Sequence, residues 1–537
     1  AFAQDAMTGR WSVEATQRST AARAAEVRRA SPSGLDSTTL ASLASLLENM
    51  GANEAFVRTV RAELVAADVI GTGVVTVDDA AIGSALASGG YSTAPAAVTI
   101  TESRLVGLPQ TSGFVDDPVC AANGNFIHSD HDLSFPGASA SLNLHRFYNS
   151  MAAATNGVFG AGWTSVFDMQ LSGVDTDTVS VSLLDGATIR FERSGDTATG
   201  PWSTSDRRDH HLTESGDRWV LRTGPTGDRC WSFDRDGHLT GWQAGTSHVA
   251  VEHDESGRVS RLVDERSRRS VEVQWDGDLV ISVVTDDGRR VEYTYAGNVL
   301  RSATSRSGRI EYVSDTALLI EARDLDGVTQ FVNVYDSIGR VIEQTSPFGR
   351  VTNYRYDETG STVITDERGV RQAMIHDARG NLTAVVDVDG SAMRLTYDDR
   401  DRVVKVVSKS GAVWEYEFDD TTSDLLRRVD PDGLSMAWTW DAAGRKVTET
   451  DRTGAVTSFD YVGEHRSPTR VVGPDGSSAS ATLDEFGQIT ELIDPDGVVT
   501  RFEWDLDGQV VAVTDALGAV TSFGYDEGGL LTRLVDP

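Results

Sequence analysis

The sequence predicts a mainly β protein, a long antiparallel ribbon of β-hairpins that follows a small α-helical region at the N-terminus. The first observation is a recurring phrase of an aromatic residue, Asp, two variable residues and Gly, clearest at residues 335–339 and 440–444. The second is its period, since the phrase returns every 20 to 22 residues, with one double step of 43. The third is that apolar and polar residues alternate between the phrases, without helical spacing. A fixed period of this size indicates a repeat architecture.

Residues 1–70 are predicted to be helical. Ala, Arg and Glu crowd residues 11–30, and Ala has the highest helix propensity. After a break at residues 32–34, two amphipathic helices follow, because apolar residues recur at i, i+3 and i+4. These apolar positions are Leu40, Leu43, Leu46 and Leu47 in the first helix, and Phe56, Val57, Val60, Leu64 and Val65 in the second. We expect the two apolar stripes to pack together as a helical hairpin.

This helical tract carries the pattern L-x-x-L-L-E-N-x-x-x-N-x-x-F at residues 43–56. The pattern resembles the helical segment that follows secretion-type N-termini in actinobacterial toxins exported by a type VII-like route. The resemblance implies a secretion machinery of this type as a partner. The alternative is a plain helical adaptor.

The region between the helices and the repeats divides into two parts. Residues 71–115 are low in charge and rich in Gly, Ala, Ser, Thr and Val, which is typical of a linker. Residues 116–232 are predicted to be a β module, because the Asn-Gly pair at residues 123–124 is a hairpin signal and residues 142–145 alternate in polarity. Turn signals at residues 185–186 and 215–217 predict further hairpins.

Each period of the repeat tract, residues 233–537, contains two turn signals. One is the aromatic-Asp-x-x-Gly phrase, and the other is a D-x-x-G or P-x-G turn, as at residues 366–369 and 430–433. Asp at the start of such a turn accepts a backbone hydrogen bond, and Gly supplies a positive φ, which we predict for Gly339 and Gly444. The runs between turns, rich in Val, Thr, Tyr and Trp, indicate strands. One repeat is therefore one hairpin, and successive hairpins must pair into a ribbon that coils.

This phrase is the YD repeat, and the tract resembles the Rhs/YD-repeat family, which includes bacterial polymorphic toxins, toxin-complex C components and teneurins. The β module carries further landmarks of this family in order. They are D-P-V at residues 117–119, G-N-F at 124–126, D-L-x-x-P-G at 132–137, R-x-Y-N-S at 146–150 and G-x-F-G-x-G-W at 157–163. The sequence departs from the family at Cys120, which follows D-P-V, and at Phe147, where many relatives have Thr.

The resemblance implies that the ribbon spirals into a hollow shell, with the β module helping to close one end. In the toxin members the shell encloses a C-terminal toxic domain. The chain would then be the non-enzymatic, secreted or cell-surface shell of an Rhs-type polymorphic toxin, with its own C-terminal toxin as cargo, in interbacterial competition. The alternative is a cell-surface or cell-wall protein whose YD repeats bind carbohydrate. A third possibility, an enzyme, requires a clustered acid–base or metal site.

Composition argues against several classes of partner. The formal net charge of −33 argues against nucleic-acid binding, for which a basic surface is expected, and against docking on anionic lipid. There is no apolar run of about 18 residues, so no membrane span is predicted. The chain starts without Met or a signal-peptide pattern and stops at Pro537, where a D-P-x-G turn would begin. We therefore expect a fragment truncated at both ends.

Three groups of residues are candidate sites, and each has a structural explanation. The D-x-D-G turns at residues 324–327, 387–390 and 494–497 pair two carboxylates, but an EF-hand needs a third ligand and a Gly at position 6, so we predict structural turns without calcium. The repeat aromatics are expected to pack across strands rather than to bind sugars. The third group could form a metal or acid–base site, although H-x-x-H on a strand places its two rings on opposite faces. Its members are His128, Asp130, His131, Asp132 and His145.

No catalytic residue, cofactor site or metal site is therefore predicted in this chain, which also lacks a G-x-S-x-G elbow. Cys120 and Cys230 form neither a C-x-x-C pair nor a metal cluster. In an exported protein they could form a disulfide, and otherwise they are two small buried apolar side chains. The two leading hypotheses differ in one feature. A shell predicts that Tyr and Trp are buried or face the lumen, whereas a glycan-binding protein predicts rows of them exposed on the outer face.

Overall fold

The computed structural model describes most of the chain from residue 106 onward. The described ranges are 106–109, 111–116, 118–135, 141–174, 176–193, 201–204, 210–223, 229–244, 247–526 and 529–537. Apart from the turns 357–360 and 388–390, they belong to one compact unit. The predicted helices of residues 1–70, and the predicted linker up to residue 105, lie outside the described residues. Within the described ranges, no helix has the length and apolar character needed to cross a membrane.

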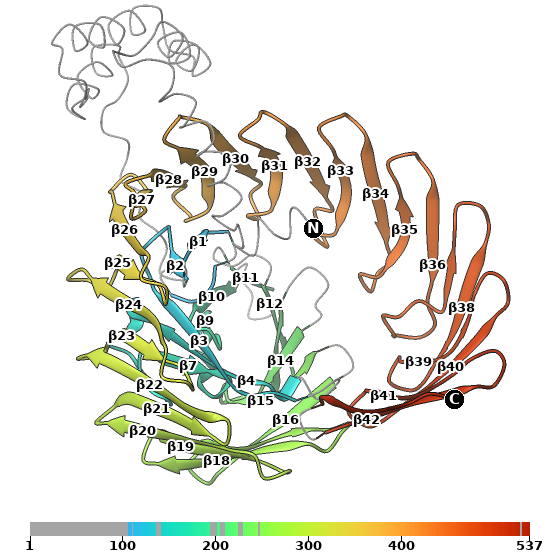
Figure 1. The fold of residues 1–537 in the computed structure, drawn as a ribbon, viewed down its shortest axis with the longest axis horizontal. Coiled ribbons are helices and arrows are strands. Elements are labelled where there is room, and N and C mark those ends of the chain that lie inside the picture. Colours follow the sequence, from blue (N-terminus) through green and yellow to red (C-terminus); the bar gives the residue numbers. More distant parts are fainter. Residues whose placement is uncertain are drawn as a thin grey trace, which may run out of the picture. The chain divides into compact units, whose positions relative to one another are not determined.

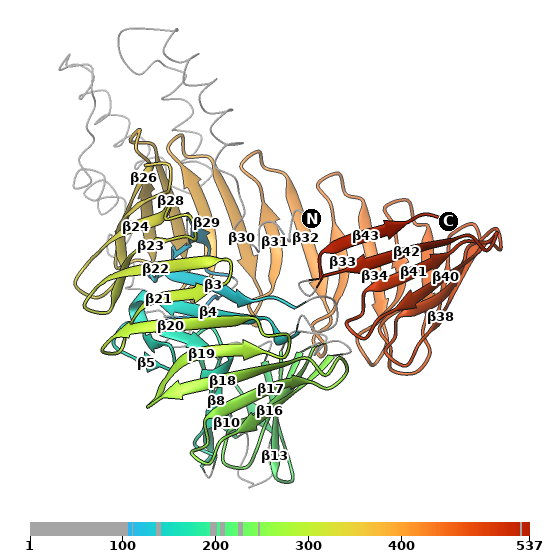
Figure 2. The same cartoon turned by 60° about the horizontal axis from the view of Figure 1, so that its bottom comes forward.

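One antiparallel sheet of 32 strands dominates this unit, which confirms the predicted ribbon (Figures 1 and 2). Each strand pairs with the strands before and after it in the chain, as expected for a succession of hairpins. The first strands are β12 (His210–Ser215), β13 (Arg218–Thr223), β14 (Arg229–Phe233), β15 (Leu239–Ala244), β16 (Ser247–His253), β17 (Val259–Asp264), β18 (Ser270–Asp276), β19 (Leu279–Thr285), β20 (Arg290–Ala296), β21 (Val299–Ser305), β22 (Gly308–Asp315), β23 (Leu318–Arg323), β24 (Thr329–Tyr335), β25 (Val341–Thr345), β26 (Val351–Tyr356), β27 (Ser361–Thr365), β28 (Arg371–His376) and β29 (Leu382–Asp387).

The ribbon continues with the same two-strand period to the end of the chain. These strands are β30 (Ala392–Tyr397), β31 (Val403–Val407), β32 (Val413–Phe418), β33 (Leu425–Val429), β34 (Ser435–Trp440), β35 (Lys446–Thr450), β36 (Val456–Asp460), β37 (Arg470–Val472), β38 (Ser478–Leu483), β39 (Ile489–Ile493), β40 (Val499–Trp504), β41 (Val510–Thr514), β42 (Val520–Tyr525) and β43 (Leu531–Val535). The sheet begins at β12, inside the region 116–232 that the sequence assigns to the β module. Its first strands therefore join the ribbon before the YD phrase starts.

The described residues before the ribbon, 106–204, form four small antiparallel sheets, which we call the pre-repeat module. The sheets pair as β1-β2, β3-β4-β7, β5-β6 and β8-β9-β10-β11. The elements are β1 (Phe114–Val115), β2 (Val119–Cys120), β3 (Ile127–Leu133), β4 (Leu144–Asn149), the 3-10 turn η3 (Ser150–Ala152), β5 (Asn156–Gly157), β6 (Gly160–Ala161), β7 (Trp163–Ser165), the 3-10 turn η4 (Val166–Asp168), β8 (Gln170–Ser172), β9 (Thr178–Ser182), β10 (Thr188–Arg193) and β11 (Trp202–Ser203).

The hydrophobic core lies between the pre-repeat module and the first part of the ribbon. Phe126 of the module packs edge-on against Phe331 of β24, with ring centroids 4.6 Å apart, and both side chains are fully buried. The core cluster ends at Ile364 on β27. Thr111 and Ser112 extend the contact, since the Thr111 carbonyl accepts from the amide of Leu382 on β29. We call β12–β29 the covered ribbon and β30–β43 the uncovered ribbon.

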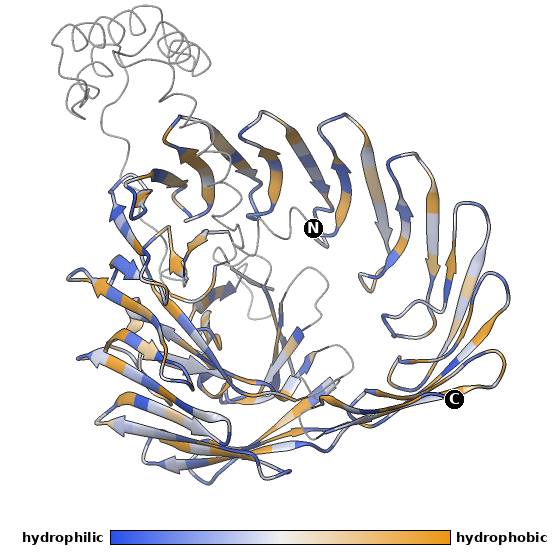
Figure 3. Cartoon of the chain, in the orientation of Figure 1, coloured by the Kyte–Doolittle hydropathy of each residue, from blue (hydrophilic) through white to orange (hydrophobic). Residues whose placement is uncertain are grey.

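The face that carries the core continues without interruption into the uncovered ribbon. Cross-strand partners follow it from Tyr354 to Ile364 and from Met374 to Val385 and Met393. Alternating hydrophilic and hydrophobic segments along the strands are visible in Figure 3. The apolar residues on this inner face of the uncovered ribbon are Met393, Leu395, Val406, Trp414, Tyr416, Met436, Trp438, Phe459, Val471, Leu492, Phe502, Val513, Phe523 and Leu534.

In its fullest form the YD phrase links one repeat to the next through its Asp, Arg and aromatic side chains. The arginine–aromatic contact of this form occurs at Arg258–Trp275, Arg340–Tyr356, Arg402–Phe418 and Arg445–Tyr461. In the turn after β24, the Asp336 carboxylate accepts from the amides of Ile338 and Arg340, and Gly339 has φ 87°, as predicted. The Arg340 Nε donates to the same carboxylate at 2.7 Å. Its guanidinium lies 4.9 Å from the ring centroid of Tyr356, the aromatic residue of the following repeat. We call this arrangement the repeat interlock.

The aromatic residue completes the interlock by donating a hydrogen bond backward. The Tyr356 hydroxyl donates to the carbonyl of Val341, the first residue of β25, at 2.6 Å. The same bond, to a carbonyl 15 or 16 residues earlier, recurs at nine aromatic residues. They are Trp275, Tyr295, Tyr335, Tyr356, Tyr397, Trp440, Tyr461, Trp504 and Tyr525. The phrase therefore needs a long aromatic donor, and Tyr and Trp both supply one.

The ribbon coils far enough for late turns to contact an early one. Arg266, in the turn between β17 and β18, donates to the side-chain oxygen of Gln488 and lies 3.9 Å from the ring centroid of Phe486. Arg269, in the same turn, lies 3.7 Å from the carboxylate of Asp507. We call these contacts between turns the seam. They join residues more than 200 positions apart in the chain.

Candidate functional site

A buried charge network joins the pre-repeat module to the covered ribbon. Arg146 on β4 is fully buried, and its Nε and Nη2 donate to the two carboxylate oxygens of Asp132 on β3, at 2.5 and 2.8 Å. Two ribbon tyrosines complete the network. The Tyr293 hydroxyl donates to Asp132 at 2.7 Å, while the Tyr312 hydroxyl donates to Asp130 and accepts from Arg146 at 2.9 Å. Every charge is therefore paired or hydrogen-bonded, as buried charges require.

Aromatic rings enclose the guanidinium of Arg146. Its central carbon lies 4.8 Å from the ring centroid of Trp163 and 5.5 Å from that of Phe159. Burial lowers the pKa of Arg146, but Asp132, Tyr312 and Asp130 together outweigh burial and raise it well above its usual value. Burial raises the pKa of Asp130, but His128 and Arg146 outweigh it and hold that pKa well below its usual value. The network therefore stays charged and closed to solvent, which fits a structural anchor and not a reacting group.

The structure separates the predicted histidine cluster as the strand geometry indicates. His128, Asp130 and Asp132 share the ribbon-facing side of β3, where the His128 Nε2 lies 3.2 Å from the Asp130 carboxylate. His131 stacks instead on His145 of β4 on the opposite face, with ring centroids 4.0 Å apart. Sequence reasoning found the carboxylates but missed Arg146 as their partner. The signal was available, because Arg146 opens the R-x-Y-N-S landmark.

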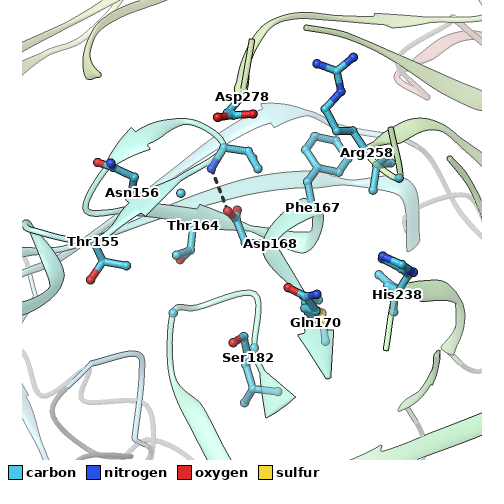
Figure 4. Close-up of a pocket in the computed structure, with 18 of the residues that line it drawn as sticks. Thr155, Asn156, Thr164, Phe167, Asp168, Gln170, Ser182, His238, Arg258 and Asp278 are labelled. Carbon is cyan, nitrogen blue, oxygen red and sulfur yellow. Dashed lines mark hydrogen bonds between the residues drawn. The ribbon is translucent and has the colours of Figure 1, made fainter. Parts of the chain in front are cut away.

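A cavity of about 500 Å³ lies between the module and the first repeats. Figure 4 shows Asp168, Thr164 and Gln170 of the module around the same space as His238, Arg258 and Asp278 of the ribbon. These are polar and aromatic groups of mixed charge, and they do not form a nucleophile–base pair.

Asp168 is the most perturbed carboxyl group at this cavity. Its carboxylate accepts from the amides of Val158 and Ser165, both at 2.8 Å, and closes a capping box at η4. Burial raises the pKa of Asp168 to about 6, and these hydrogen bonds limit the rise. The group therefore fixes the loop that carries the G-x-F-G-x-G-W landmark, and it titrates close to neutral pH.

The D-x-D-G turns have the geometry of turn aspartates. One carboxylate oxygen of Asp324 accepts from the amides of Asp326 and Val328, both at 2.9 Å. Asp494 bonds the amides of Asp496 and Val498 in the same way. In both turns the backbone already uses the oxygen that a cation would need.

The aromatic residues distinguish the shell from the glycan-binding alternative. Each tyrosine and tryptophan in the described ranges is buried or half-buried. The aromatic residues of the repeat interlock also have their polar atoms bonded to carbonyls, as Trp504 does with Ile489. Rows of exposed Tyr and Trp, which the glycan-binding alternative predicts, are not found on the described ribbon. The two cysteines are Cys120, buried on β2, and Cys230, half-buried on β14, and the structure joins them by no disulfide.

Comparison with protein families gives two matches. A model of the RHS repeat matches residues 335–371, 376–413 and 504–537. A model of a domain of unknown function, DUF6531, matches residues 116–191, which include most of the pre-repeat module. The DUF6531 match includes Asp130, Asp132 and Arg146 of the charge network, and the RHS repeat matches begin after Tyr293 and Tyr312.

Curated relatives are much longer than this chain. The tRNA nuclease WapA of Bacillus subtilis is 24% identical over 331 residues, which are 55% of this chain and 14% of that protein. The tRNA3(Ser)-specific nuclease WapA of Bacillus spizizenii matches to the same extent.

Toxin complexes are among the solved structures with similar chains. The Photorhabdus luminescens Tc holotoxin pore aligns with 67% of this chain and 22% of its own, with a TM-score of 0.42 and 11% identity. The TcdB2-TccC3-Cdc42 structure aligns with 66% of this chain and 21% of its own, with a TM-score of 0.33 and 14% identity.

Proposed function

Because this chain belongs to the Rhs/YD-repeat family, we propose that it is the shell of an Rhs-type toxin and that it encloses a C-terminal toxin domain. In this proposal the shell is not an enzyme. It acts from a secreted or cell-surface position in interbacterial competition, and the toxic activity belongs to the cargo.

The inner face of the uncovered ribbon is the observation that carries the proposal. On the covered ribbon this face packs against the pre-repeat module, and Phe331 and Tyr354 are buried there. On the uncovered ribbon the same face carries Trp438 and Phe502, both half-buried, and the core cluster of the described residues does not extend to them. A face this rich in large apolar side chains, although Arg428 and Glu449 also lie on it, marks an interaction surface. A polypeptide held inside the ribbon would cover it.

The ribbon also has the construction that a container wall needs. Among the described strands of the ribbon, β12 and β43 alone are edges, so the wall itself offers few sites for unwanted pairing. The interlock ties neighbouring repeats, and the seam ties one coil to the next. The net charge of −33 would keep the outer surface away from nucleic acid.

The relatives support a cargo with its own chemistry. The curated relatives are named as tRNA nucleases, and this chain spans 14% of their length. We propose that toxic activity of this general kind, against a target inside a competing cell, lies outside the shell portion.

Limited proteolysis of the longer protein that carries this chain tests the proposal. We expect a C-terminal fragment, identified by mass spectrometry, to survive digestion until the ribbon unfolds. The matched control is a seam variant, Arg266→Ala with Arg269→Ala, in which the fragment is cut sooner while the repeats stay intact. If the C-terminal region is cut freely in the unchanged protein, the container proposal is wrong.

A further inference from the structure

The first repeat differs from those with a full interlock, because histidine stands at both the arginine position and the aromatic position. In the standard interlock Arg340 pairs with Asp336 and covers the ring of Tyr356. At the start of the tract, His238 stands at the arginine position and His253 at the aromatic position of the next repeat. Their ring centroids lie 5.8 Å apart, so the contact between repeats is kept but its chemistry is changed.

Two aspartates bring carboxylates to the same place. Asp234 opens the turn, and one of its carboxylate oxygens accepts from the amides of Asp236 and His238, at 2.9 and 2.8 Å. Its other oxygen lies 3.2 Å from Nδ1 of His238. One ligand atom from each of Asp234, Asp236 and His238 lies within 4.8 Å of the others. Small side-chain rotations bring such atoms to a common ion.

The surroundings allow an ion to enter and to be hydrated. The side chains of Asp234 and His238 are each 40% exposed. His238 and His253 also line the cavity of about 500 Å³ shown in Figure 4, which has room for water on an open coordination position.

We propose that Asp234, Asp236, His238 and His253 bind a divalent transition metal ion of the Zn²⁺ type, which joins the first two repeats. Two imidazoles with two carboxylates suit Zn²⁺, whereas Ca²⁺ and Mg²⁺ prefer ligand sets made of oxygen alone. The ion would take the place that the arginine–aromatic contact has at Arg258, Arg340, Arg402 and Arg445. This site is independent of the enclosed toxin and would work in a shell without cargo.

The test uses the full 537-residue chain with Zn²⁺ and Co²⁺ as probes, in excess Mg²⁺ to saturate non-specific carboxylates. Calorimetry is expected to give one Zn²⁺ per chain and a rise in Tm, and Co²⁺ is expected to develop the visible absorption of a low-coordinate site. The deciding variant is His238→Arg with His253→Tyr, which restores the standard phrase. It should fold with an unchanged or higher metal-free Tm and bind Zn²⁺ at least about tenfold more weakly.

A second variant, His131→Ala with His145→Ala, removes the other histidine pair and should bind Zn²⁺ as the unchanged protein does. The proposal is overturned if the restored-phrase variant keeps the affinity and the Co²⁺ spectrum of the unchanged protein. It is also overturned if the unchanged protein takes up no Zn²⁺ in the presence of Mg²⁺.

Discussion

The covered and uncovered parts of the ribbon have the same repeat but different surroundings. Both use the same interlock, since Tyr356 of the covered ribbon and Tyr525 of the uncovered ribbon each donate to a carbonyl 15 residues earlier. On the inner face they differ, because Phe331 is buried by the module while Phe502 is half-buried without such a cover. Local interactions therefore set the strands and turns, whereas burial of the inner face is supplied by another segment.

Arg146→Ala probes the anchor of the covered part. The substitution leaves Asp130 and Asp132 buried without their cation, so we expect a loss of about 4 kcal/mol in the free energy of unfolding of the module and the strands it covers. Hydrogen exchange, resolved by peptide, measures this locally. The control is Arg445→Ala in the uncovered ribbon, where a more exposed pair with Asp441 is removed and about 1 kcal/mol or less is expected. Equal effects would mean that the module does not stabilise the ribbon.

Phe331→Ala and Phe502→Ala compare the inner face directly. Phe331 lies in the packed core, so its truncation leaves a cavity and should cost about 3–4 kcal/mol. Phe502 lies outside the core cluster of the described residues, and its truncation should cost about 1 kcal/mol or less. Urea unfolding followed by hydrogen exchange separates the two regions. In a longer protein with its cargo, the cost at Phe502 should rise toward that at Phe331, and a constant low cost would contradict enclosure.

Acid should act in opposite directions on the two regions. The pKa of Asp168 is raised to about 6 from 3.8, so the folded module binds this proton more tightly than the unfolded chain does. The free-energy cost of ionising Asp168 in the folded module is absent below about pH 4. It grows to about 2–3 kcal/mol as the pH rises through 6, and it stays constant above that pH. Lowering the pH from 7 to 5 should therefore stabilise the module, and Asp168→Asn should abolish this part of the pH dependence in thermal unfolding.

The repeat turns should respond to acid at a lower pH than the module, and acid should destabilise them. Burial raises the pKa of Asp441, but its hydrogen bonds from the amide and side chain of Arg445 outweigh burial and lower it. The folded pKa is below the unfolded value, so this stability is present above about pH 4 and is lost as the pH falls through the folded pKa. An uncovered ribbon that weakened between pH 7 and pH 5 would contradict this assignment.

Gly339→Val and Gly349→Val are expected to show the smallest difference in stability between two matched variants. Both glycines have a positive φ, 87° and 77°, so both substitutions carry backbone strain of about 1–2 kcal/mol. A Cβ at Gly339 would also lie 2.9 Å from the Ser150 carbonyl oxygen of the module, whereas a Cβ at Gly349 meets open space. We expect the Tm to fall further for Gly339→Val. Identical melting curves would show that the module contact is unimportant there.

The sequence was sufficient for everything that depends on neighbours within one period. The phrase at residues 335–339 predicted its turn, the positive φ of Gly339 and the hairpin, because these are decided by residues close in the chain. The double step of 43 residues conceals one repeat. Within it, Tyr461 makes the standard bond to the carbonyl of Lys446 without a following Asp. The aromatic donor is thus the more persistent part of the phrase.

Contacts across long sequence distances could not be predicted. Arg146 meets Tyr312 across 166 positions, and Arg266 meets Gln488 across 222. Such pairs depend on the curvature accumulated over many strands, and the twist of each strand varies over a range that sequence does not specify. The contacts of the module with β20 and β22 depend on the same accumulated curvature. Sequence reasoning therefore found the two aspartates of the anchor but not the tyrosines that they bond.

The seam has a mechanical consequence. Within the ribbon, adjacent strands are joined by rows of backbone hydrogen bonds, but at the seam Arg266 and Arg269 hold opposing turns through side chains alone. A pulling force across the seam has to break only a few contacts worth about 1 kcal/mol each before the turns part. Rupture would therefore start there, at low load, and the two coils could separate and rejoin many times while every hairpin remained intact.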